Sequence, residues 1–162
     1  MSPDQINEIL RQHHLWTKNQ VGGNKADFSC CNLRGFNFSR QRLVEVEFIG
    51  ADLEGASFDD CVCNDICFRF ANLKNASFTR TTCRWGSFKL ANLTGAKFTD
   101  SDISRCYFQN ANLSNAKLVN TLFLSSKFPN CNVDNIEVSG QPGRDDFGMF
   151  KAMYNSINNI RV

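Results

Sequence analysis

Residues 51–58 read ADLEGASF, and the same string returns as ANLKNASF at 71–78, ANLTGAKF at 91–98 and ANLSNAKL at 111–118. The copies are 20 residues apart, and each contains two apolar centres separated by five residues. A period of five matches neither an α-helix, which repeats every 3.6 residues, nor a simple strand, which repeats every second residue. The two periods together predict a solenoid that closes on itself after four five-residue units, so that equivalent residues stack in columns.

The five-residue register runs unbroken from Phe28 to Val138. Its centres are apolar side chains, and the position two residues earlier is mostly Ala or Cys, so we expect both to point inward. The last position of each unit is rich in Gly, Asn and Asp, which tolerate the positive φ that a corner requires. Some small inward positions hold bulkier residues, where local distortion is expected: Phe36, Gln41, Val46, Ile66 and Ile136.

The units ADLEG at 51–55 and ANLTG at 91–95 match the pattern A(D/N)LxX, and by this pattern the chain resembles the pentapeptide-repeat family. The resemblance covers residues 26–140. It implies an all-β solenoid, a right-handed quadrilateral β-helix of about six coils, in which one coil is one circuit of four units.

Both ends of the solenoid are expected to carry capping α-helices, because open coil ends expose apolar side chains and unpaired strand edges. We therefore expect a capping helix and linker at 1–25, the β-helix at 26–140 and a second capping helix at 141–162. Ser2, Pro3 and Gln5 fit an N-cap, a first helical position and a capping box. An apolar face then follows at helical spacing: Ile6, Ile9, Leu10 and His13.

The C-terminal segment has a second interpretation. Apolar residues recur at helical spacing after the break at Pro142-Gly143. They offer a homodimer contact as the alternative to capping: Phe147, Phe150, Tyr154 and Ile157.

The N-terminus lacks an apolar leader, and no stretch approaches the length of a membrane span. Of the eight cysteines, six fall on inward positions, where a small apolar side chain is needed. Reduced thiols in a cytoplasmic protein are therefore expected, rather than a secreted disulfide scaffold.

Candidate catalytic and metal-binding chemistry is weak throughout the chain. No phosphate-binding loop, dinucleotide motif, HExxH or nucleophile elbow occurs. His13 and His14 are the only histidines, and the pair Cys61 and Cys63 has no second pair of ligands at matching spacing. We expect no enzymatic activity, no cofactor and no metal.

The outward residues differ between the sides of the predicted coil. Two sides are almost wholly polar, whereas the other two carry apolar residues interleaved with cations. Exposed aromatics mixed with arginine are typical of protein interfaces. We predict a partner-binding patch that consists of Phe70, Trp85, Leu90, Tyr107, Arg69, Arg84 and Arg105. Self-association, or coverage of the patch by the protein's own termini, remain alternatives.

Charge separates the candidate functions. The chain has a net charge of +2, and residues 26–140 contain twelve Lys/Arg and twelve Asp/Glu, so the repeat region is neutral. Direct nucleic-acid binding is therefore not expected, because a phosphate backbone requires a basic stripe. The main prediction is a non-enzymatic interaction module for an unidentified protein. The family resemblance implies an alternative, a DNA mimic that binds DNA gyrase or topoisomerase IV, but mimicry requires a dominantly negative surface.

Overall fold

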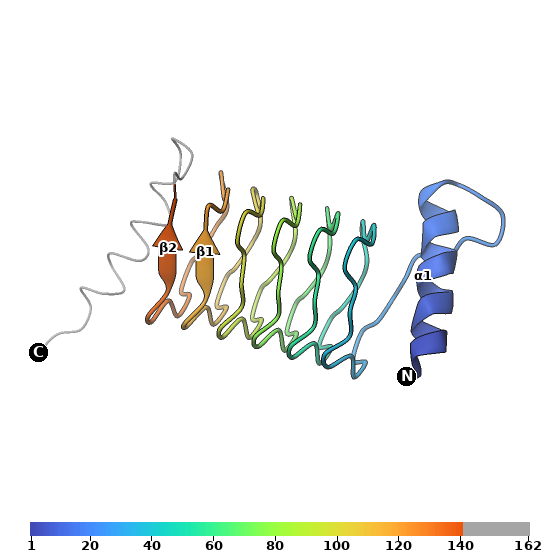
Figure 1. Cartoon of the computed structure of the whole chain (residues 1–162), viewed down its shortest axis with the longest axis horizontal. Helices are drawn as coiled ribbons and strands as arrows, with labels where there is room; N and C mark the ends of the chain where they lie inside the picture. Colours follow the sequence, from blue (N-terminus) through green and yellow to red (C-terminus); the bar gives the residue numbers. More distant parts are fainter. Residues whose placement is uncertain (141–162) are drawn as a thin grey trace, which may run out of the picture.

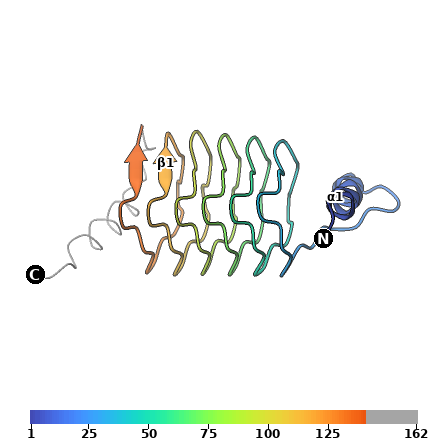
Figure 2. The ribbon, with the colours of Figure 1, turned by 60° about the horizontal axis from the view of Figure 1, so that its bottom comes forward.

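The computed structural model describes residues 1–140, which form a stack of coils with the helix α1 (Pro3–Thr17) at its N-terminal end (Figure 1). Each coil pairs with the next through short parallel bridges between residues 20 apart, such as Asp52 with Asn72. The pairing lengthens into two strands, β1 (Lys117–Val119) and β2 (Glu137–Ser139). The chain therefore closes once every 20 residues, as its sequence period predicts (Figure 2).

Backbone hydrogen bonds run in both directions between neighbouring coils. The Phe48 N–H donates to the Cys67 carbonyl at 2.8 Å, and the Cys67 N–H donates back to the Val46 carbonyl at 3.0 Å. Each corner is a four-residue turn, as where the Ala51 N–H donates to the Phe48 carbonyl at 3.1 Å. Its third residue, here Gly50, has a φ of +65°, which is the conformation that type II turns require at this position. The expected corners are confirmed.

The interior is filled by the central residues of the five-residue units. From Phe28 to Leu118 they are at most 2% exposed, whereas Val138 at the end of the described stack is half-buried. Phe68 and Phe88 stack with ring centroids 5.2 Å apart, and the Phe68 ring meets the Phe78 ring edge-on at 5.7 Å. Both geometries are favourable for aromatic pairs. Columns of stacked rings that also contact each other edge-to-face therefore hold successive coils together.

Hydroxyl side chains at the small inward positions find acceptors on the backbone. The hydroxyls of Thr81, Ser101 and Ser126 each donate to a backbone carbonyl, at 2.6, 2.7 and 2.6 Å respectively. Buried hydroxyls need such partners, because a lost hydrogen bond is costly inside a protein. These positions therefore remain part of the packed interior.

The expected distortion at Val46 and Ile66 does not interrupt the pairing between neighbouring coils. Both residues are buried, and the hydrogen bonds from Cys67 to the Val46 carbonyl and from Ser87 to the Ile66 carbonyl, 3.0 and 2.9 Å long, are intact. The reason at Ile66 is Gly86, one coil above it, since a Cβ there would lie 3.3 Å from the Ile66 Cγ2. Phe36 and Ile136 are half-buried and Gln41 is exposed, so these three side chains are not fully enclosed by the coil.

Helix α1 begins with the predicted capping box, in which the Ser2 N–H donates to Gln5 Oε1 at 2.8 Å and the Gln5 N–H donates to Ser2 Oγ at 3.3 Å. Its buried residues Ile6 and Leu10 belong to the same apolar cluster as the coils, and His13 is buried on the same helix. The Ala26 N–H donates to His13 Nδ1 at 3.2 Å and so joins the helix to the start of the first coil.

The second expected helix, at 141–162, and its candidate dimer contacts Phe147, Phe150, Tyr154 and Ile157 lie outside the described residues. Within the described part of the chain, no helix has the length and apolar character needed to cross a membrane.

Candidate protein-interaction surface

The apolar residues of the predicted patch lie together on the outside of the solenoid. Phe70 and Leu90 occupy the same corner of successive coils, Trp85 occupies the preceding corner, and Tyr107 lies on the side between the two corners. Their exposed fractions are 53% for Phe70, 48% for Leu90, 44% for Trp85 and 41% for Tyr107. Within residues 1–140 the patch is thus open to solvent, because α1 lies over the N-terminal end of the stack instead (Figure 1).

Cations lie against all three rings of this patch. The guanidinium carbon of Arg69 is 5.5 Å from the Phe70 ring centroid, and that of Arg105 is 5.1 Å from the Trp85 centroid. The ammonium nitrogens of Lys89 and Lys127 lie 5.4 and 5.7 Å from the Tyr107 centroid. Such distances allow favourable cation–π contacts.

We define the aromatic–basic surface as these rings and cations together with Leu90: Arg69, Phe70, Trp85, Lys89, Leu90, Arg105, Tyr107 and Lys127.

Lys89 and Lys127 are missing from the residues that the sequence predicted for the patch. The signal for Lys127 was present, because Lys127 stands 20 residues after Tyr107 and therefore occupies the same column in the next coil. Lys89 immediately precedes the exposed corner residue Leu90, as Arg69 precedes Phe70.

Arg84 differs from the other predicted cations. Its guanidinium lies 2.6 Å from an Asp102 carboxylate oxygen. Burial opposes the ionisation of Asp102, but hydrogen bonds from Ser104 and Arg84 outweigh burial and lower the pKa of this carboxyl. Arg84 is thus already neutralised by a carboxylate of the next coil, whereas Arg69, Lys89, Arg105 and Lys127 form no ion pair with any residue between 1 and 140.

Three apolar residues of this surface occupy a backbone conformation that disfavours them. Phe70, Trp85 and Leu90 have φ values of +60°, +58° and +60°. For bulky side chains the left-handed region is a strained conformation, with a cost of about 1–3 kcal/mol per residue. Other corners hold Gly, Asn or Asp, as at Gly55, Asn75 and Asp60, or polar and charged side chains, as at Arg80 and Ser125. The aromatic–basic surface therefore contains apolar residues that the fold itself does not need.

A hollow of about 340 Å³ adjoins the surface where the corner of Trp85 meets the neighbouring side of the coil. Trp85, Leu122 and Leu124 provide its apolar walls, and Arg105 and the Arg84–Asp102 pair provide its polar part. Leu122 is 41% exposed. This arrangement suits an apolar side chain whose neighbours carry negative charge.

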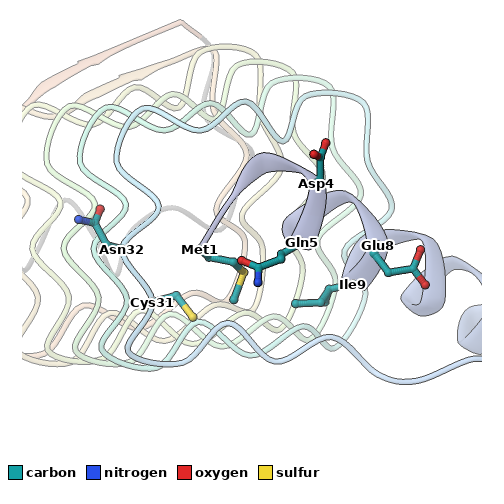
Figure 3. Close-up of a pocket in the computed structure, with 7 residues that line it drawn as sticks. All are labelled: Met1, Asp4, Gln5, Glu8, Ile9, Cys31 and Asn32. Atoms are coloured by element: carbon teal, nitrogen blue, oxygen red, sulfur yellow. The ribbon is translucent and has the colours of Figure 1, made fainter.

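A second hollow, of about 710 Å³, lies between α1 and the first coil (Figure 3). Met1, Gln5 and Ile9 of the N-terminal segment lie on one side of it, and Cys31 lies on the other. The described residues that line it include no nucleophile paired with a general base.

The cysteines differ in their surroundings, and a hydrogen bond with Cys63 lowers the pKa of Cys61. All eight are free thiols. Burial raises the pKa of Cys63 and of Cys83 well above the ordinary thiol value, which keeps both in the unreactive thiol form. Among residues 1–140, no three His, Cys, Asp or Glu side chains are grouped so that they could hold a metal ion.

Comparison with known proteins assigns the fold family. The family model described as pentapeptide repeats matches in eight copies, over residues 24–60, 56–95, 66–105 and 106–140. The chain belongs to the pentapeptide-repeat family, whose members form right-handed quadrilateral β-helices. Proteins of this family are generally structural or interaction proteins rather than enzymes. No curated protein matches the sequence.

Several solved structures are similar to this chain. HetL, involved in heterocyst differentiation regulation in the cyanobacterium Nostoc sp. strain PCC 7120, is 16% identical over 72% of this chain and 59% of its own, with a TM-score of 0.39. A protein from the Arabidopsis thaliana thylakoid lumen is 22% identical over 67% of this chain and 65% of its own, with a TM-score of 0.29. QnrB1, a plasmid-mediated fluoroquinolone resistance protein, is 15% identical over 78% of this chain and 85% of its own, with a TM-score of 0.39. The chain spans less than two thirds of the length of the first two.

Proposed function

We propose that this protein is a non-enzymatic interaction module that holds another protein on its aromatic–basic surface. The observation that carries the proposal is the placement of Phe70, Trp85 and Leu90 at exposed corners with positive φ. The repeat imposes positive φ on corners throughout the solenoid, but it does not require a bulky apolar side chain at any of them, so these three side chains are available to a partner.

The composition of the surface supports binding to a protein. Aromatic residues and arginine are enriched in protein interfaces, and they dominate the residues whose truncation weakens binding most. Trp85 and Tyr107 keep large exposed areas that a partner would bury. The remaining sides of the coil carry ladders of polar side chains that bond to one another, such as Asn72 Nδ2 to Asp52 Oδ1 at 2.9 Å.

DNA mimicry of the kind that would engage a topoisomerase is less well supported. A mimic needs rows of carboxylates that are not neutralised by its own cations. Here Asp52 and Glu54 are both within 3.2 Å of Arg34, and Asp60 lies 2.7 Å from Arg80. These three carboxylates are therefore balanced by cations of the protein itself.

The proposal can be tested by capture of partners from a lysate of the native host. We expect the triple variant Phe70→Ser, Trp85→Ser, Tyr107→Ser to lose proteins that the unaltered chain retains. A matched triple variant, Lys74→Ser, Lys97→Ser, Lys117→Ser, changes three exposed residues on other sides and should retain them. Circular dichroism checks that both variants fold. If the folded aromatic variant captures the same set of proteins, the proposal is wrong.

A further inference from the structure

The cations of the aromatic–basic surface are available to an external anion. Arg69, Lys89, Arg105 and Lys127 form no ion pair within residues 1–140, whereas Arg34, Arg80 and Arg84 are each paired with a carboxylate of a neighbouring coil. They follow one side of the solenoid and the two corners that bound it: Arg69 and Lys89 occupy equivalent positions 20 residues apart beside one corner, Lys127 lies on the side, and Arg105 lies at the other corner. The result is a local row of positive charge on a repeat region that is neutral as a whole.

Apolar side chains lie between the cations of this row and line the hollow beside Trp85. Trp85, Leu122 and Leu124 line the hollow of about 340 Å³, and Arg105 lies beside it. A ligand that satisfies both features must carry negative charges and, between them, an apolar side chain that fits the hollow.

We propose that the aromatic–basic surface binds an acidic protein segment, with carboxylates at Arg69, Lys89, Arg105 and Lys127 and an apolar side chain in the hollow beside Trp85. This inference rests on the function proposed above and specifies the chemistry of the partner. Complementary charge at the rim of such a site orients the partner and speeds association, while the apolar anchor slows dissociation.

Two other occupants fit less well. A second copy of this chain, packed on the same surface, would bring the unpaired cations of one copy close to those of the other, and like charges placed together are unfavourable. Single-stranded nucleic acid needs open ring faces on which bases can stack. The Phe70, Trp85 and Tyr107 rings each have a cation within 5.7 Å of their centroid, which restricts that stacking.

The inference can be tested with short fluorescein-labelled peptides and anisotropy measurements on the full chain. One peptide alternates glutamate with leucine, and the second has glutamine in place of each glutamate. An oligothymidylate of equal length serves as the nucleic-acid probe. We expect the glutamate peptide to bind about tenfold more tightly than the glutamine peptide or the oligothymidylate, and its affinity should fall as salt is added.

Charge-reversed variants locate the binding. Arg69→Glu with Lys89→Glu should weaken binding of the glutamate peptide by at least roughly tenfold. Lys97→Glu with Lys117→Glu makes the same change in net charge on another side of the coil and should leave the affinity within about twofold. Leu122→Ser should weaken binding without altering its salt dependence, because it removes a wall of the hollow and no charge.

The inference is overturned if the glutamate peptide does not bind, if the glutamine peptide binds equally well, or if the oligothymidylate binds more tightly. It is also overturned if the two charge-reversed variants lose affinity equally. These failures are distinct from failure of the proposed function, because lysate capture that still depends on Phe70, Trp85 and Tyr107 would leave an interaction module with a partner of different chemistry.

Discussion

Arg105 lies over the ring of Trp85, with its guanidinium carbon 5.1 Å from the ring centroid, and the two residues occupy the same corner of successive coils. Both have positive φ, +60° for Arg105 and +58° for Trp85. The contact is possible because corners stack directly above one another. The same stacking places Leu90 above Phe70 at the next corner, so the solenoid turns isolated side chains into a continuous surface.

The corner conformation makes a prediction about stability. Replacing Leu90 with Asn should leave the free energy of unfolding unchanged within about 0.5 kcal/mol, because relief of the left-handed backbone offsets the lost apolar contact. Replacing Asn115 with Leu, at an exposed corner with a φ of +59°, should lower the free energy of unfolding by about 1 kcal/mol. Urea denaturation of both variants measures the difference. A stable Asn115→Leu variant together with a strongly destabilised Leu90→Asn variant would show that Leu90 serves the fold rather than a partner.

A second prediction concerns the aromatic columns. Phe88 is fully buried, with its ring centroid 5.2 Å from that of Phe68 and 4.7 Å from that of Phe108. Phe88→Ala should therefore lower the free energy of unfolding by about 3–5 kcal/mol, since it leaves a cavity within a continuous column. Phe88→Leu retains most of the volume and should cost much less. Equal losses for the two variants in urea denaturation would contradict this account of the interior.

Much of this structure could be predicted from the sequence, because a five-residue period fixes which side chains point inward. Phe48, Phe68 and Phe88 fall in one column by counting alone, and the corner residues follow from the same count. The apolar patch also followed from the count, since Phe70, Trp85 and Leu90 fall on outward positions of two neighbouring sides.

Other features of the structure depend on distances between side chains, which the five-residue repeat does not specify. The outward position of Arg84 groups it with the other cations of the patch, yet Asp102, 18 residues later in the next coil, neutralises it at 2.6 Å. The fit of Ile66 beneath Gly86 likewise depends on how far one side chain reaches into the coil above it.

Helix α1 should respond to pH through His13. Burial is the main cause that lowers the pKa of His13 below its ordinary value of 6.5, and the nearby charges of Lys25, His14 and Arg42 add to this effect. His13 Nδ1 accepts a hydrogen bond from the Ala26 N–H, and Nε2 is buried without a partner among the described residues. Protonation of His13 therefore places an unpaired charge between α1 and the start of the first coil. The unfolded or undocked state then binds more protons than the folded state, so stability falls as the pH drops below 6.5.

Trp16 can report this change, because its ring stacks on His13 with centroids 5.4 Å apart. In a Trp85→Phe background, Trp16 fluorescence should shift toward that of an exposed indole as the pH falls through the range below 6.5. The control is His13→Asn, whose side-chain oxygen can still accept from Ala26 but does not titrate. An identical fluorescence shift in the control would assign the pH response to another group.

The pair Ile66 and Gly86 should be coupled energetically, and a double-mutant cycle can measure the coupling. A Cβ on Gly86 would lie 3.1 Å from Cys83 Sγ and 3.3 Å from Ile66 Cγ2, which is closer than ordinary contact. Gly86→Ala in the unaltered chain should therefore lower the free energy of unfolding by about 1 kcal/mol or more, because the buried neighbours must move. In an Ile66→Ala background the same substitution should cost less, since the contact with Ile66 Cγ2 is removed while the contact with Cys83 Sγ remains, and the backbone of residue 86 does not require positive φ. We expect a coupling of about 1–2 kcal/mol from urea denaturation of the four variants. Simple additivity would mean that the coil accommodates Ile66 by some route other than the missing side chain of Gly86.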